Sequence, residues 1–288
     1  MTKSHLLVLF GMLFLCNACH SQSDNSTEYA RARNAFHTQL TSEIKAPQTY
    51  SEFDDVRGTV KQLSYPSGDL RLKALLDTTN LESGKKSPVL VYLHGGFSLD
   101  YADVTVCRPF IDAGYLVFAP TYRGENGNPG NFEFFLGEVD DIKAAINWLA
   151  SQEYVDRENI YVFGHSIGGG LSLLTTFHPD IPVKRSGSCA GIYYDENFAY
   201  WAEEDGIVPF DYENDNELFW RLPIYTLEHM TRDHLMYIGN NDYYKEDKAD
   251  FEDMYPNQDT RLQLVKVKGD HQSSLPVAIK QFLDDIRK

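Results

Sequence analysis

The chain has 288 residues, with 26 basic and 42 acidic side chains that give a formal net charge of −16. Hydrophobic residues make up 42% and charged residues 24%, ordinary globular values that exclude a disordered or collagen-like chain. The length allows one large domain or two small ones with a substantial core. The acidic balance argues against a nucleic-acid partner, because binding a phosphate backbone requires clustered Lys and Arg.

The first residues have the pattern of an export signal. Lys3 supplies a positive charge, and an unbroken apolar run follows over residues 6–15. This run is too short for a hydrocarbon core, which needs roughly 20 residues, but it fits a secretory signal. Ala18 before Cys19 resembles a bacterial lipoprotein signal, although Cys16 stands where an aliphatic residue is usual. We therefore predict export.

This signal divides the chain into three parts. We predict a signal peptide of the lipoprotein type over residues 1–18, a polar tether and N-terminal extension over 19–57, and one folded domain over 58–288. A short helix is expected around 29–44. Lipidation of Cys19 would anchor the protein to a membrane in the bacterial periplasm. The alternative is an ordinary secretory signal, cleaved nearby, that leaves no anchor.

Two further cysteines, Cys107 and Cys189, lie in the predicted domain. An oxidising compartment permits a disulfide between them, but two thiols make no disulfide framework. We expect both to be small buried apolar residues.

Short β-like runs alternate with helical periods through this domain. An antiparallel pair with a PSGD turn opens it, and apolar runs typical of buried parallel strands follow. The alternation predicts an α/β fold with a mostly parallel sheet covered by helices on both faces. The predicted strands are 58–65, 70–76, 88–93, 115–120, 159–163, 184–190, 234–238 and 262–267, and the predicted helices are 139–149, 167–177, 251–254 and 275–286.

Residues 164–168 read Gly-His-Ser-Ile-Gly, a G-x-S-x-G sequence between an apolar strand and a helical run. A nucleophile on a sharp strand-to-helix turn takes strained dihedral angles, and its neighbours must be small so that other backbone fits. The helix N-terminus then directs free amides at an oxyanion. In this context the motif predicts Ser166 as a nucleophile rather than as a capping residue in a glycine-rich turn.

The stretch HGGF at residues 94–97 directly follows a predicted buried strand. An α/β-hydrolase places at this point the loop that donates its second oxyanion amide. The predicted donors are the N–H of Ile167 and the N–H of Gly96 or Phe97. His94 precedes the serine in the chain, so we expect it to hold the loop through its ring rather than to act as a base.

A serine nucleophile needs a base, and the base needs an acid that orients it. In this fold the chain order is Ser, then Asp or Glu, then His. Asp242 follows a predicted strand at the carboxyl end where open α/β sheets carry their sites, and His271 follows the last strand. We predict Asp242 as the acid and His271 as the base. Glu246 and Asp247 are rivals that fall within the next helix, and Asp270 is expected on the loop surface.

From Leu76 to its end the chain resembles the α/β-hydrolases, and within them the catalytic domain of the prolyl oligopeptidase family. The resemblance rests on LVYLHGGF, APTYRGENGNPG and GEVDDIKAAINWLASQEYVDRENIYVFGHSIGGG. It implies the α/β-hydrolase fold, with Ser166 as nucleophile, Asp242 as acid and His271 as base. This chemistry requires no cofactor and no metal.

The chain departs from the peptidases of that family in two ways. They carry a β-propeller before the hydrolase domain, and too few residues precede the first buried strand here to build one. The elbow also reads GHSIGG instead of an aromatic-containing form. Single-domain relatives include esterases of small or carbohydrate esters and enzymes that resemble dienelactone hydrolases. The expected substrate is a small molecule, a peptide or a carbohydrate ester.

A cap insertion is expected over about 192–225. Residues 195–221 contain nine acids, one base and seven aromatics. Most of the acids are expected to be solvated, because charge runs usually are, whereas some of the aromatics are expected to contact the substrate. The acids match no calcium loop, and no zinc motif is present. Their excess near the expected pocket makes a strongly anionic substrate unfavourable.

The sequence therefore predicts an exported serine hydrolase that cleaves an ester or peptide bond through an acyl-enzyme. The alternative is a non-catalytic binding lipoprotein on a hydrolase scaffold, because a fold does not fix a function. The discriminating observation is whether His271 and Asp242 lie within hydrogen-bond reach of one another and of Ser166. Nothing in the sequence specifies an oligomeric state.

Overall fold

The computed structural model of the chain describes residues 25–50, 53, 56–243 and 261–288. Within them, eight strands form one sheet in the order β1-β2-β4-β3-β5-β6-β7-β8. The first three strands of this order pair antiparallel and all the others pair parallel, which confirms the predicted mostly parallel α/β fold. The strands are β1 (Val60–Ser67), β2 (Leu70–Asp77), β3 (Ser87–Leu93), β4 (Leu116–Pro120), β5 (Val155–His165), β6 (Arg185–Cys189), β7 (His234–Gly239) and β8 (Leu262–Val267).

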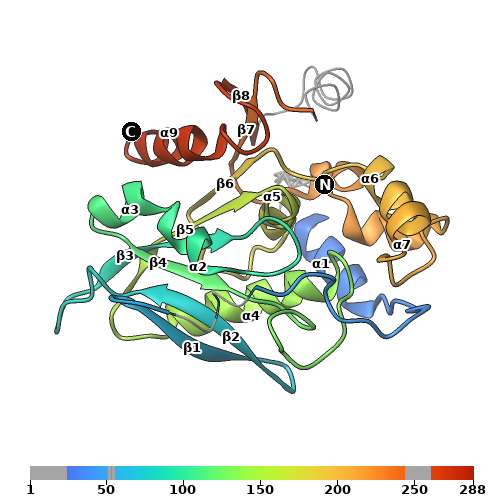
Figure 1. Cartoon of the computed structure of the whole chain (residues 1–288), viewed down its shortest axis with the longest axis horizontal. Coiled ribbons are helices and arrows are strands. Elements are labelled where there is room, and N and C mark those ends of the chain that lie inside the picture. The colour runs from blue at the N-terminus through green and yellow to red at the C-terminus, as the bar shows by residue number, and fades with distance from the viewer. Residues whose placement is uncertain (1–24, 51–52, 54–55, 244–260) are drawn as a thin grey trace, which may run out of the picture.

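Helices cover both faces of this sheet (Figure 1). Apolar residues of α4 and α5 belong to the core on one face, and those of α2, α3 and α9 to the core on the other. The helices are α1 (Asn25–Ala35), α2 (Tyr101–Thr105), α3 (Arg108–Asp112), α4 (Gly137–Ala150), α5 (Ile167–Leu174), α6 (Glu196–Tyr200), α7 (Asp215–Arg221) and α9 (Leu275–Ile286). The predicted helix 251–254 lies outside the described residues.

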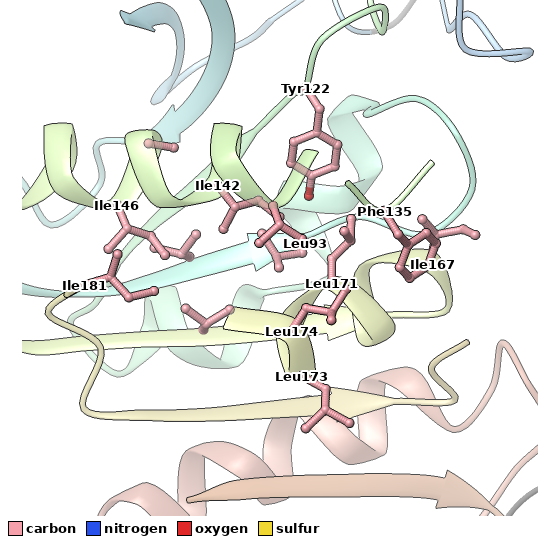
Figure 2. Close-up of a cluster of buried hydrophobic side chains, with 14 of the residues drawn as sticks. Leu93, Tyr122, Phe135, Ile142, Ile146, Ile167, Leu171, Leu173, Leu174 and Ile181 are labelled. Atoms are coloured by element: carbon pink, nitrogen blue, oxygen red, sulfur yellow. The ribbon is translucent and has the colours of Figure 1, made fainter. Parts of the chain in front are cut away.

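The packing of the central strand β3 explains why its residues 88–93 are apolar. Val89 and Val91 join the core on one face, whereas Leu90 and Tyr92 join the core on the other, as the alternation of strand side chains requires. A parallel strand covered on both faces leaves no position for a polar side chain. Figure 2 shows the first core, where Ile142 and Ile146 of α4 face Leu171 and Leu174 of α5 around Leu93.

The predicted helix at 167–177 is shorter than expected. Helix α5 ends at Leu174, and a 3-10 turn, η2 (Thr175–Phe177), continues it. The hydroxyls of Thr175 and Thr176 donate to Ser172 O and Leu173 O at 2.7 Å. Threonine hydroxyls that bond carbonyls of the preceding turn compete with regular helical geometry.

The N-terminal helix also differs from its prediction, because it begins at Asn25 and ends at Ala35 rather than near residue 44. Tyr29 is buried against Phe177, with ring centroids 5.4 Å apart. Arg33 is buried as well and donates to Asp140 at 2.7 Å. Beyond Ala35 the chain continues as an irregular arm over residues 36–50.

Both cysteines of the domain are buried and carry free thiols, which confirms their expected role as small core residues. In the part of the chain that the structure describes, no helix has the length and apolar character needed to cross a membrane. The predicted signal over residues 1–18 and Cys19 lie outside the described residues.

The segment between β6 and β7 contains α6, the π-helical turn η3 (Trp201–Asp205), α7, η4 (Pro223–Tyr225) and η5 (Leu227–His229). Helices α6 and α7 lie together at the right-hand end of Figure 1. Its acids are mostly exposed, as predicted. Glu217 is the exception, because it is buried and paired with the fully buried Arg221.

Candidate active site

Ser166 stands at the sharp turn between β5 and α5. Its backbone angles are φ 51° and ψ −117°, a region that residues other than glycine rarely adopt and that is typical of a nucleophile elbow. A Cβ at Gly164 would lie 1.9 Å from Gly168 O, and one at Gly168 would lie 2.1 Å from Leu93 O. The two glycines of the motif are therefore required by close backbone contacts. Ser166 is partly exposed although its neighbours are buried.

This packing makes Gly168 sensitive to any side chain. We expect Gly168→Ala to lower the free energy of unfolding by about 3 kcal/mol or more, because the clash is with backbone that cannot rotate away. Gly84→Ala is the control, since Gly84 has φ +75° but no atom within 4 Å of an added Cβ. It should lose about 1 kcal/mol. Urea unfolding measures both, and equal losses would contradict the close packing of the elbow.

The HGGF loop lies beside the elbow. A Cβ at Gly95 would be 3.4 Å from Ser166 Cβ. Gly168 N donates to His94 O at 3.1 Å, which joins the loop to α5. Of the three predicted oxyanion amides, those of Ile167 and Gly96 have no acceptor within the described residues. Phe97 N differs, because it donates to the side-chain oxygen of Gln48 at 2.8 Å.

His94 holds this loop from beneath, as expected. Its Nε2 lies 3.1 Å from a Glu125 carboxylate oxygen, and its ring stacks on Tyr122 with centroids 5.1 Å apart. Burial opposes the charged ring, but the Glu125 carboxylate outweighs it and raises the pKa of His94 to about 9. A fully buried imidazolium paired in this way is a structural group, not a general base for Ser166.

Asp242 and His271 meet at the carboxyl ends of β7 and β8. Gly239 and Val267 pair at the last position of these adjacent strands, so the loops that follow lie side by side. His271 Nδ1 is 3.4 Å from both carboxylate oxygens of Asp242. Asp242 is fully buried and His271 is 5% exposed. The structure thus brings the predicted acid and base together.

The rival acids are placed elsewhere. Glu246 and Asp247 lie outside the described residues. Asp270 is exposed, as predicted, and its carboxylate accepts from Ser273 N at 2.8 Å and from Gln272 N at 3.1 Å. Asp270 therefore stabilises the turn before α9.

His165 links the elbow to the loop of His271. Its Nε2 lies 2.9 Å from His271 O, and the two rings have centroids 4.9 Å apart. Burial lowers the pKa of His165 to about 4, so the ring is neutral and its Nε2–H donates to this carbonyl. The Tyr243 ring also packs against the His271 ring, with centroids 4.6 Å apart. Neither contact leaves a signal in the sequence, because both join loops that are distant in the chain.

Aromatic side chains connect this site to the segment between β6 and β7. The Phe97 ring lies 5.6 Å from Trp201 of η3 and 5.4 Å from Phe134, which in turn lies 4.8 Å from Phe198 of α6. Phe134 and Phe135 both have positive φ, 58° and 71°, which is unusual for bulky residues. Trp201 is partly exposed and the four Phe rings are buried. The segment between β6 and β7 therefore packs directly on the loop that carries the predicted oxyanion donors.

Comparison with known proteins agrees with this fold. Residues 102–245 match the sequence pattern of the prolyl oligopeptidase family. The chain is 36% identical to the uncharacterized peptidase YtmA of Bacillus subtilis (strain 168) over 118 residues. These residues make up 39% of this chain and 44% of that protein. The chain thus spans less than half of that relative's length.

Two solved structures have the same fold. An acylaminoacyl peptidase from Pyrococcus horikoshii superposes with a TM-score of 0.60 at 19% identity, over 78% of this chain and 39% of its own. An S-formylglutathione hydrolase from Staphylococcus aureus superposes with a TM-score of 0.61 at 16% identity, over 80% of this chain and 98% of its own. The α/β-hydrolase fold is thus shared with a peptidase in which it is part of a longer chain and with a hydrolase of similar size.

Proposed function

The chain belongs to the prolyl oligopeptidase family and is a serine hydrolase, and we propose that Ser166, His271 and Asp242 perform its reaction as nucleophile, base and acid. The observation that carries this proposal is the pairing of His271 with the fully buried Asp242, on a loop that His165 of the strained elbow contacts through His271 O. A serine at such a turn, with a base oriented by a buried carboxylate, is the arrangement that acyl transfer requires.

The proposed reaction has two halves. Ser166 Oγ attacks the substrate carbonyl while its proton passes to His271 Nε2, since Nδ1 faces Asp242. The imidazolium then protonates the leaving alcohol or amine as the C–O or C–N bond breaks, which leaves an acyl-enzyme. Water repeats the sequence and releases the acid. The N–H groups of Ile167 and Gly96 hold the negative oxygen in both halves, because Phe97 N already donates to Gln48.

The proposed substrates are esters and peptides. The family is one of peptidases, whereas the hydrolase of similar size, S-formylglutathione hydrolase, is named for a thioester. A panel of p-nitrophenyl esters, acetylated sugars and aminoacyl amides tests the proposal, with the Ser166→Ala protein as the blank. Turnover of at least one class above the blank is expected. No turnover of any class would favour the alternative of a binding protein on a hydrolase scaffold.

Export and lipid attachment at Cys19 are part of the same proposal and are supported by the apolar run and the Ala18–Cys19 pair. They are tested by expressing the full chain in a bacterium that is fed an alkyne fatty acid. Label on the wild-type protein that is lost in Cys19→Ala is expected. Equal labelling of the two proteins, or none, would reject the anchor.

A further inference from the structure

The N-terminal arm, residues 36–50, reaches from the end of α1 to the HGGF loop. Phe132 N donates to Ile44 O at 2.9 Å, and Ala46 N donates to Gly124 O at 3.1 Å. These backbone bonds tie the arm to the loop after β4. These hydrogen bonds therefore hold this part of the arm against the domain.

Gln48 is the residue of this arm that meets the site. Its carboxamide oxygen accepts from Phe97 N at 2.8 Å and from the Tyr50 hydroxyl at 3.4 Å. Two donors on one oxygen fix which end of the carboxamide is which. Among the described residues, no acceptor lies within hydrogen-bond distance of Gln48 Nε2. Gln48 is half-buried.

Gln48 and the proposed nucleophile Ser166 lie next to two consecutive glycines, Gly96 and Gly95. A Cβ at Gly96 would lie 2.6 Å from the Gln48 oxygen, and a Cβ at Gly95 would lie 3.4 Å from Ser166 Cβ. Ser166 and both glycines are partly exposed. The carboxamide and the nucleophile thus lie against neighbouring residues of one exposed stretch of backbone, along which a substrate carbonyl would be held.

We propose that Gln48 supplies a side-chain donor to the oxyanion hole, an inference that rests on the function proposed above. The N–H of Phe97 donates to the Gln48 oxygen, and this bond orients the carboxamide. The NH2 group then donates to the carbonyl oxygen that becomes negative when Ser166 attacks. A donor already fixed by the fold needs no reorganisation during the reaction, which is the condition for strong oxyanion stabilisation.

A different reading treats Gln48 as a plug, whose oxygen occupies the Phe97 amide until the substrate displaces it. The backbone bonds of Ile44 and Ala46 argue against a plug, because they hold the arm two residues from Gln48. A third reading gives Gln48 only a structural role on the loop. The three readings predict different changes in rate, so one set of variants separates them.

The test compares Gln48→Glu and Gln48→Ala with the wild-type enzyme on p-nitrophenyl acetate. A glutamate keeps the oxygen that accepts from Phe97 but has no NH2 group, whereas alanine removes both. We expect kcat to fall about 100-fold in both variants with KM changed by less than about threefold. Gln39→Ala, an exposed residue of the same arm, should retain the wild-type rate.

A rise in kcat/KM of Gln48→Ala would support the plug and overturn the proposal. Wild-type rates in Gln48→Glu would overturn it in favour of a structural role. Labelling with a fluorophosphonate separates these failures from that of the proposed function. If the wild-type protein neither hydrolyses the ester nor accepts the label, both proposals fall, whereas an active wild type with unchanged Gln48 variants rejects the Gln48 donor alone.

Discussion

Ser166→Ala is expected to lower kcat by about 10⁴-fold or more on any substrate that the wild-type enzyme turns over. In the proposed mechanism this change removes the oxygen that forms the bond to the acyl group. The remaining rate would come from the oxyanion amides and substrate binding alone. Steady-state kinetics with an enzyme titration measure the loss.

The fold should not account for this loss. Ser166 is partly exposed. At its positive φ, replacing serine with alanine should lower the free energy of unfolding by about 1 kcal/mol at most. The exposed Ser83, changed to alanine, is the matched control and should keep the wild-type rate. A Ser166→Ala enzyme that retains more than about a tenth of the wild-type kcat would reject Ser166 as the nucleophile.

Asp242→Asn is expected to lower kcat by about 10³- to 10⁴-fold. In the proposed mechanism the carboxylate accepts from His271 Nδ1, which keeps the other nitrogen available as the base and stabilises the imidazolium that forms. An amide of the same shape loses the charge, and its NH2 group favours the wrong tautomer of the ring. Because Asp242 is fully buried, no solvent ion replaces it.

Asp270→Asn is the matched control for this change. It makes the same chemical substitution one residue from His271, but at an exposed carboxylate that accepts from Ser273 and Gln272. Kinetics of the two variants at one pH give the comparison. We expect Asp270→Asn within about twofold of the wild-type rate. Equal losses in both variants would show that the loop, rather than the Asp242 carboxylate, limits the reaction.

The elements that carry strong local patterns were predictable. The apolar run of β3 and the strand-serine-helix order around Ser166 each predict one structure. The alternation of strand-like and helical runs predicts the sheet. Asp242 and His271 were located by chain order and by their positions after strands. In contrast, α2 and α3 have five residues each, too few for a helical period to be visible.

The contacts that the sequence did not reveal are those between distant loops. The hydrogen bond from His165 to His271 O joins residues 106 apart in the chain, and that from Phe97 to Gln48 joins residues 49 apart. Neither leaves a periodic signal, because each depends on where a loop is carried by the sheet. The positive φ of Phe134 is equally hidden, since aromatic residues rarely adopt it.

The most direct test of the account maps the site of a fluorophosphonate adduct by peptide mass spectrometry. The reagent reacts with a serine hydroxyl only where a base activates it, so it reports the nucleophile and its partners at once. We predict one adduct, on the peptide that contains Ser166, formed by the wild-type protein and lost in His271→Ala. An adduct on another residue, or one that forms equally fast without His271, would contradict the proposed Ser166, His271 and Asp242 mechanism.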